Sequence, residues 1–109
     1  MFEIDFKLNE PFALESGEIL SPLDLRCSIY GKLNAEKSNA VLIFHALTGS
    51  SRIGEWWGDI LGDGLGLDTS RFAFVCINAL GSCYGSTPGK SIKSVVTPRD
   101  IARSQKLLL

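Results

Sequence analysis

Two short runs of continuous apolar residues stand out from the rest of the sequence. Ala40–Phe44 (AVLIF) and Phe72–Ile77 (FAFVCI) are continuously apolar and lack polar alternation, which predicts two strands covered on both faces of a parallel sheet. Ligands bind beyond the carboxyl ends of such strands. The loops that follow, His45–Ser51 and Asn78–Ser86, are therefore predicted to converge on one crevice.

The N-terminal part shows a different pattern. Phe2–Leu8 (FEIDFKL) and Leu23–Tyr30 (LDLRCSIY) alternate between apolar and polar residues, which predicts strands with one solvated face. Glu15–Glu18 contains Gly17, which tolerates the positive φ of a tight reversal. The first 39 residues are therefore expected to form an antiparallel, hairpin-containing region.

Two helices are predicted farther along the chain. Glu55–Leu61 (EWWGDIL) is expected to form a short helix, although Gly58 costs about 1 kcal/mol relative to alanine. A second helix begins after Thr97, whose side chain is a suitable cap, with Pro98 at the first helical position and Asp100 near the positive end of the dipole. The sequence ends on three leucines without a glycine stop, which we interpret as truncation within an element.

Composition narrows the functional class. The 109 residues are 45% hydrophobic and 21% charged, with a net charge of −1, as in one soluble globular domain without a basic footprint for nucleic acid. No apolar run is long enough to cross a bilayer and the N-terminus does not resemble a secretory signal. We therefore expect a cytoplasmic protein with no nucleic-acid or membrane partner. Three cysteines and one histidine do not form a zinc-binding pattern.

Nucleotide-binding motifs are not supported. Gly85–Ser91 (GSTPGKS) has three residues, not four, between the first glycine and the Gly-Lys pair, and GDGLG follows a predicted helix instead of a strand.

His45 is the only histidine, and the chain contains no Gly-x-Ser-x-Gly nucleophile elbow. We interpret His45 as a structural residue bonded to the loop backbone, Asp68 as a turn cap, and Trp56 and Trp57 as packing residues.

Several segments in order resemble one family. The strings HALTGSS, WW, LDTSRF, NALGSCYGST and TPRDIARSQKLL, preceded by ESGE and YGKLN, resemble the N-terminal part of the homoserine O-acetyltransferases, which are α/β-hydrolase-fold acyltransferases. The likeness covers nearly the whole chain. It departs at residues 85–89, where GSTPG replaces the usual GSTGP, and the segment before Thr97 is shorter than usual.

The resemblance implies the fold and the reaction. It implies an α/β fold, the N-terminal half of an α/β hydrolase truncated before the nucleophile elbow. Residues 1–109 would be one partial domain, with the hairpin in 1–39 and, in 40–109, the start of the parallel sheet and the helix preceding the nucleophile strand. The family transfers an acyl group from acetyl-CoA, or succinyl-CoA in some members, to the hydroxyl of L-homoserine in methionine biosynthesis, without a bound cofactor. Its Ser-Asp-His triad would lie beyond Leu109, so this chain is expected to be inactive alone, and the full-length enzyme to be a homodimer.

The resemblance also implies site residues. Leu47 matches the position whose backbone N–H forms part of the oxyanion hole, a contribution of about 3 kcal/mol that needs no particular side chain. The substrate-binding positions that it implies are Ala46, Thr48, Gly49, Asn78, Gly81 and Ser82.

Two alternatives remain open. The same fold could catalyse ester hydrolysis, or acylation of another hydroxyl compound such as serine. Alternatively, the chain could be a non-catalytic fragment. In the family's strand order the neighbour of Ala40–Phe44 is absent, and the exposed edge would then promote self-association.

Overall fold

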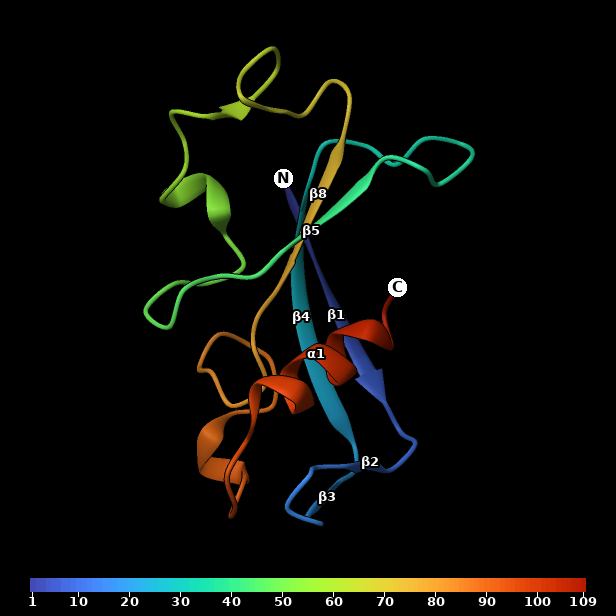
Figure 1. Ribbon diagram of the computed structural model, residues 1–109, viewed down its shortest axis with the longest axis vertical. Coiled ribbons are helices and arrows are strands. Elements are labelled where there is room, and N and C mark those ends of the chain that lie inside the picture. The colour runs from blue at the N-terminus through green and yellow to red at the C-terminus, as the bar shows by residue number, and fades with distance from the viewer. The chain divides into compact units, whose positions relative to one another are not determined.

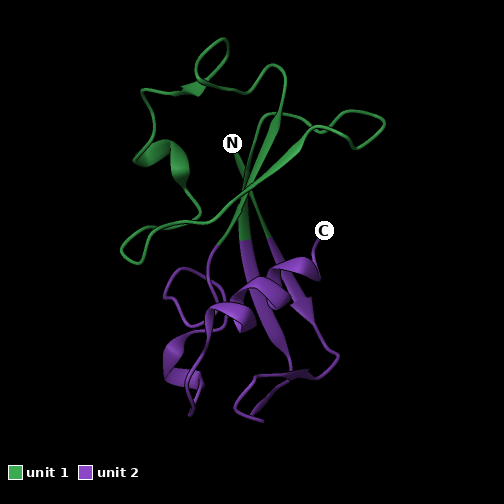
Figure 2. Ribbon diagram, viewed as in Figure 1, with its two compact units in different colours: residues 1–4, 27–77 green, residues 5–26, 78–109 purple.

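The computed structural model describes residues 1–109, which divide into two compact units (Figure 2). Unit 1 consists of residues 1–4 and 27–77, and unit 2 of residues 5–26 and 78–109. The strands and helices, labelled in Figure 1, are β1 (Phe2–Leu8), β2 (Phe12–Ala13), β3 (Ile19–Leu20), β4 (Leu23–Tyr30), β5 (Ala40–Ile43), β6 (Leu61–Gly62), β7 (Leu67–Asp68), β8 (Ala73–Ile77) and α1 (Pro98–Lys106), with single 3-10 turns η1 at Ile53–Glu55 and η2 at Gly89–Ser91.

Four strands form the main sheet in the order β1-β4-β8-β5. β4 runs antiparallel to β8, and β5 runs parallel to it, with Ala40 opposite Ala73 and Ile43 opposite Cys76. The four strands that the hydrophobic pattern predicts are therefore confirmed, as is the parallel pairing of the two apolar runs. Because β5 and β8 are parallel, their carboxyl ends lie at the same edge of the sheet.

The prediction that both apolar runs are covered on both faces is wrong for β5. Ala40 is exposed, Val41 and Leu42 are half-buried, and Phe44, which follows the strand, is 56% exposed. β8 is mostly buried. In these 109 residues β8 lies between two strands and β5 lies at the end of the sheet, which is the position that the family's strand order predicts for it.

The core of unit 1 lies against one face of this strand pair. Ile43, Ile53, Phe74 and Cys76 form a buried cluster, against which Val41 packs. The register places Val41 opposite Phe74 and Ile43 opposite Cys76, and residues two apart on a strand share a face. Ala40 and Leu42 therefore lie on the opposite face of β5.

The predicted helix over residues 55–61 is also wrong. Only the η1 turn forms, followed by further turns that lead into the short parallel pair β6–β7. Trp56, Trp57 and Ile60 remain 36%, 37% and 46% exposed, so no apolar face is buried to offset the cost of Gly58 in a helix. A Cβ at Gly58 would lie 2.9 Å from the Gly54 carbonyl oxygen.

The predicted turns of both units are confirmed. Gly17 has a φ of +95° and reverses the chain between β2 and β3, which pair antiparallel in unit 2. In unit 1, the Asp68 carboxylate caps its turn by accepting hydrogen bonds from the Ser70 hydroxyl at 2.6 Å and from two backbone N–H groups. These hydrogen bonds lower the pKa of Asp68, and the bond from the Ser70 hydroxyl has the largest effect.

The N-terminus of α1 is built as predicted. The Thr97 hydroxyl accepts a hydrogen bond from Asp100 N–H, and the Asp100 carboxylate accepts one from Thr97 N–H at 3.0 Å, which completes a capping box behind Pro98. Asp100 is fully buried and also accepts from Glu15 N–H at 2.9 Å. Burial would raise the pKa of this carboxyl group, but the hydrogen bonds from Thr97 and Glu15 outweigh it and lower the pKa. Asp100 therefore ties α1 to the β2–β3 hairpin.

None of the helices in the structure combines the length and the apolar composition that a membrane-spanning segment needs.

We predict that Asp100→Ala lowers the free energy of unfolding by about 1–3 kcal/mol, because it removes a charged acceptor and leaves two N–H groups without their partner. Urea denaturation followed by circular dichroism measures this change. Arg99→Ala is the matched control, since Arg99 is exposed and its ion pair with Glu15 is 3.8 Å long. Equal losses for the two variants would contradict the prediction.

Stability should also fall in acid. The pKa values of Asp100 and Glu18 lie below their ordinary values of 3.8 and 4.5, Glu18 chiefly because it accepts a hydrogen bond from the Ser94 hydroxyl. A lowered carboxyl pKa stabilises the folded state at pH values above the unfolded pKa, and this stabilisation disappears as the pH falls through the folded pKa. Urea midpoints should be flat above about pH 5.5 and fall below about pH 4, less steeply in Asp100→Ala. A constant midpoint from pH 5 to pH 3 would refute this.

Candidate functional site

The loop after β5 contains a tight turn. Gly49 N–H donates to the Ala46 carbonyl oxygen at 2.8 Å, which places Leu47 and Thr48 at the two central positions. The Leu47 side chain is fully exposed. Neither the Leu47 nor the Thr48 N–H takes part in the hydrogen bond that closes the turn. The turn therefore fixes the position of the Leu47 backbone but not that of its side chain.

His45, at the start of this loop, is bonded to the loop backbone as predicted. Its Nδ1 donates to the Ala46 carbonyl oxygen at 2.8 Å. The Cys76 thiol on β8 is fully buried and forms a hydrogen bond with the backbone of His45. This hydrogen bond lowers the pKa of the thiol by less than burial raises it. Burial raises the pKa of Cys76 to about 12. The thiol is therefore protonated near neutral pH and is a poor nucleophile.

Unit 1 fixes the other end of the loop. The Ser51 hydroxyl is fully buried and shares a 2.7 Å hydrogen bond with the Ser28 hydroxyl on β4. The next residue, Arg52, forms a two-pronged ion pair with Glu3 on β1, at 2.9 and 3.0 Å, and this pair raises the pKa of Arg52. The turn at Ala46–Gly49 thus lies between two anchored ends.

The loop after β8 belongs to unit 2 and closes on itself. Asn78 is buried, its backbone N–H donates to the Arg26 carbonyl oxygen at 2.8 Å, and its side-chain amide donates to the Tyr84 carbonyl oxygen at 2.9 Å. The Ser86 hydroxyl donates to the Asn78 carbonyl oxygen at 2.6 Å and accepts from Arg26 N–H. The hydrogen bonds of Asn78 therefore fix the shape of its own loop.

The middle of this loop borders a hollow of about 630 Å³. Gly81 and Ser82 line it, together with Asp24, Cys83, Gly85, Ser86, Pro88, Gly89 and Lys90. Gly81 has a φ of +89° and its N–H donates to the Thr87 carbonyl oxygen. Thr87 in turn pairs with Asp24 through both its backbone and its hydroxyl, which holds the returning segment against β4.

Gly85 is required by close packing. Its φ is +101°, and a Cβ there would lie 2.5 Å from Arg26 Nε and 2.7 Å from Arg26 Cζ. The Arg26 guanidinium is held by Asp5 at 2.6 and 3.0 Å, and this hydrogen bond lowers the pKa of Asp5. Glycine therefore fits two constraints at once, the left-handed backbone and the contact with a fixed cation.

The structure gathers the predicted site residues into two groups. Ala46, Leu47, Thr48 and Gly49 form one turn in unit 1, and Asn78, Gly81 and Ser82 lie in one loop of unit 2. A shared crevice for the two groups stays a prediction. Sequence reasoning missed the residues that hold the loops, above all Ser51, Thr87 and Arg26, because hydrogen bonds between distant segments leave no local pattern.

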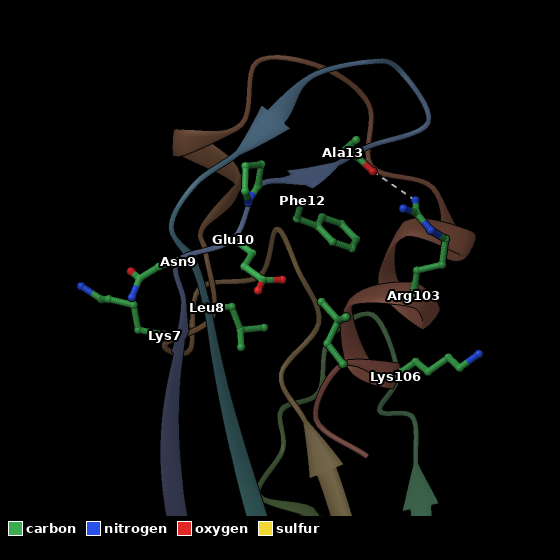
Figure 3. A pocket seen from close by; sticks show the side chains of 10 residues that line it. Lys7, Leu8, Asn9, Glu10, Phe12, Ala13, Arg103 and Lys106 are labelled. Carbon is green, nitrogen blue, oxygen red and sulfur yellow. Dashed lines mark hydrogen bonds between the residues drawn. The ribbon is translucent and has the colours of Figure 1, made fainter.

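A larger hollow of about 1080 Å³ lies elsewhere in unit 2, between the segment from Lys7 to Ala13 and the end of α1 (Figure 3). Phe12 and Leu8 lie at its centre, while Lys106 points away and Arg103 donates to the Ala13 carbonyl oxygen at 3.1 Å. It contains none of the predicted site residues. No group of three or more His, Cys, Asp or Glu side chains in the structure is arranged to hold a metal ion.

Solved structures identify the class of fold. Esterase E22 superposes with a TM-score of 0.84 at 27% identity, over 99% of this chain and 36% of that one. Homoserine O-acetyltransferase from Staphylococcus aureus superposes with a TM-score of 0.82 at 27% identity, over 97% of this chain and 34% of that one. The chain therefore has the N-terminal portion of the α/β-hydrolase fold, which confirms the predicted fold class.

Sequence relatives narrow the class. Homoserine O-acetyltransferase from Geobacter sulfurreducens is 40% identical over 99% of this chain and 33% of its own length. Homoserine O-acetyltransferase from Geobacter metallireducens is 43% identical over 88% of this chain and 32% of its own length. The resemblance to the homoserine O-acetyltransferases is thus confirmed, and the chain spans about a third of the length of these relatives. No protein-family profile matches the chain.

Replacing Gly85 should disturb the second loop. We predict that Gly85→Ala lowers the free energy of unfolding by more than about 2 kcal/mol, because it adds a clash with Arg26 to the cost of a positive φ. Gly17→Ala is the control, since Gly17 has a φ of +95° and open space around it, and should cost about 1 kcal/mol. Urea denaturation compares the two, and equal losses would show that the contact with Arg26 is unimportant.

Proposed function

We propose that this chain supplies the N-terminal part of a homoserine O-acyltransferase, which transfers an acetyl group from acetyl-CoA to the hydroxyl of L-homoserine. The observation that carries the proposal is about 40% identity to homoserine O-acetyltransferases along 88–99% of the chain. Because the chain spans only a third of these relatives, the activity, the substrates and a homodimeric whole enzyme are part of the proposal. Succinyl-CoA is the alternative donor.

In this proposal the turn at Ala46–Gly49 contributes to the oxyanion hole. When a nucleophile attacks the acetyl carbonyl, negative charge develops on its oxygen, and a fixed N–H aimed at that oxygen lowers the barrier. Leu47 suits this role because its N–H lies outside the hydrogen bond that closes the turn and its side chain is fully exposed. The anchored ends of the loop keep the N–H in place without cost during the reaction.

The nucleophile of the proposed reaction lies outside these 109 residues. The chain contains no Gly-x-Ser-x-Gly elbow, and its only histidine is bonded to a backbone carbonyl. Cys76 is buried and protonated. In the whole enzyme a serine would accept the acetyl group as CoA leaves and then pass it to homoserine. Ala46, Thr48, Gly49, Asn78, Gly81 and Ser82 are the residues proposed to bind the substrates.

Ester hydrolysis is the second candidate, because esterase E22 superposes as well as the acetyltransferases do. The two reactions differ in whether water or an alcohol takes the acyl group from the enzyme. An assay that offers homoserine, serine and water together distinguishes them by the product formed.

A chimera tests the proposal directly. This chain replaces the matching N-terminal segment of the Geobacter sulfurreducens homoserine O-acetyltransferase, and O-acetylhomoserine formation is measured. We predict an active chimera and an inactive 109-residue chain. In the chimera, Leu47→Pro should lower kcat by about 100-fold or more, since proline removes the N–H but is accepted at the second position of a turn.

Leu47→Ala is the matched control for the chimera, because it shortens an exposed side chain and keeps the N–H. It should stay within about threefold of the unmodified chimera. An inactive but folded chimera, or turnover by the 109-residue chain alone, would contradict the proposed function. Equal losses for the proline and alanine variants would contradict the backbone role of Leu47.

A further inference from the structure

Hydrogen bonds constrain the whole segment that follows the turn at Ala46–Gly49. The Gly49 N–H closes the turn, and the Ser50 hydroxyl accepts a hydrogen bond from the Arg52 N–H at 3.2 Å. Ser51 lies within this second turn, and its side chain is fully buried. A displacement of Ser51 is therefore transmitted to the first turn, because no flexible link between them absorbs it.

A closed ring of interactions holds the end of the loop. The Ser51 and Ser28 hydroxyls share a 2.7 Å hydrogen bond. The Ser28 hydroxyl donates to Glu3 Oε2 at 3.4 Å, which makes Ser51 the donor to Ser28, because a hydroxyl has only one proton. Glu3 also accepts from the Arg52 guanidinium at 2.9 and 3.0 Å, and Arg52 directly follows Ser51 in the chain. Each of the four residues therefore has its partner fixed by another member of the ring.

The core of unit 1 fixes the residues that follow the ring. Ile53 is fully buried in the core cluster, and the Gly54 N–H donates to the Tyr30 hydroxyl at 3.1 Å. A Cβ at Gly54 would lie 2.9 Å from Tyr30 Cε1. Ser28 and Tyr30 are two residues apart on β4 and therefore share a face. This face of β4 holds the chain at residues 51 and 54, so the ring is attached to the core.

The ring has a buried end and a charged end. Ser28 and Ser51 are 0% exposed, whereas the side chains of Glu3 and Arg52 are 25% and 48% exposed. Hydrogen bonds to ionised groups are stronger than those between neutral groups, and a buried polar group that loses its partner is destabilising. Removing the Ser51 hydroxyl would leave the buried Ser28 oxygen without its donor, and the end of the loop would no longer be held to β4.

We propose that Ser51, Ser28 and Glu3 are positioning residues for the oxyanion hole, which set the orientation of the Leu47 N–H without touching the substrate. This inference rests on the proposed function, in which that N–H stabilises the developing negative charge. The contribution of such a donor depends on its exact placement, and a displacement of about 1 Å lowers a rate by up to about 100-fold. The ring thus makes a residue of β1, Glu3, important for turnover at a turn that it does not contact.

The first test uses the 109-residue chain and requires no activity. Backbone amide relaxation, measured by nuclear magnetic resonance, gives the order parameters of Leu47, Thr48 and Gly49. We expect values of about 0.85 in the unmodified chain and below about 0.6 in Ser51→Ala. Ser38→Ala is the matched control, since Ser38 is an exposed serine of the same unit outside the loop, and it should change nothing. Low values in the unmodified chain, or unchanged values in Ser51→Ala, would overturn the proposal.

The second test measures kcat and KM in the chimera described above. Ser51→Ala should lower kcat by about tenfold and leave KM within about twofold, because the N–H contact strengthens only as negative charge develops. Glu3→Gln, at a partly exposed position, should lower kcat by about threefold, because it weakens a charged hydrogen bond. Leu67→Ala is the control for lost stability, since Leu67 packs against the core of unit 1 from β7. It should leave kcat within about twofold at a temperature at which circular dichroism shows every variant to be folded.

A double-mutant cycle separates positioning from a general loss of structure. In a chimera that already carries Leu47→Pro, the N–H is absent, so Ser51→Ala should lower kcat by less than about twofold further. A tenfold loss in both backgrounds, an unchanged kcat in Ser51→Ala, or an equal loss in Leu67→Ala would each overturn the positioning role. An inactive unmodified chimera would instead contradict the proposed function, and the order parameters would then decide whether the ring holds the turn.

Discussion

The parallel pairing of β5 with β8 in a single register is the constraint on which the rest of the structure depends. With Ile43 opposite Cys76, the alternate residues Val41, Ile43, Phe74 and Cys76 share one face and build the core of unit 1. A slip by one residue would turn one strand's apolar set to the other face. Because the strands are parallel, both also end on the same side of the sheet, where each continues into a loop of small residues. The core and the loops are therefore consequences of one pairing.

Each loop is then held by contacts of its own unit. The first is held by the buried pair of Ser51 with Ser28, the second by the return of Thr87 to Asp24. The first contact joins two side-chain hydroxyls, and the second joins Thr87 to Asp24 through backbone and side-chain groups. In the proposed function, the group that acts at the first loop is the backbone N–H of Leu47, whose side chain is fully exposed. The side chain of His45, the only histidine, is engaged in a hydrogen bond with the Ala46 carbonyl oxygen.

Local pattern was sufficient for the strands, the Gly17 turn and the capped start of α1, because periodicity, a positive φ and a capping box are all written in neighbouring residues. Local pattern was not sufficient where the structure depends on burial against distant segments. Residues 55–61 have helical composition but no face to bury, and they form turns. β5 has a buried composition but an edge position. Some of the hydrogen bonds that shape the second loop join residues far apart in sequence, such as Arg26 and Ser86, and no single-sequence pattern reports them.

The central claim is the register of β5 against β8, and the most direct measurement is the set of interstrand proton contacts between them by nuclear magnetic resonance. The structure predicts backbone contacts that pair Val41 with Phe74 and Leu42 with Val75 in the pattern of a parallel ladder, together with slow amide exchange along β8. Contacts shifted by one residue, or an antiparallel pattern between these two strands, would contradict the shared core face and the common edge on which the description of both loops rests.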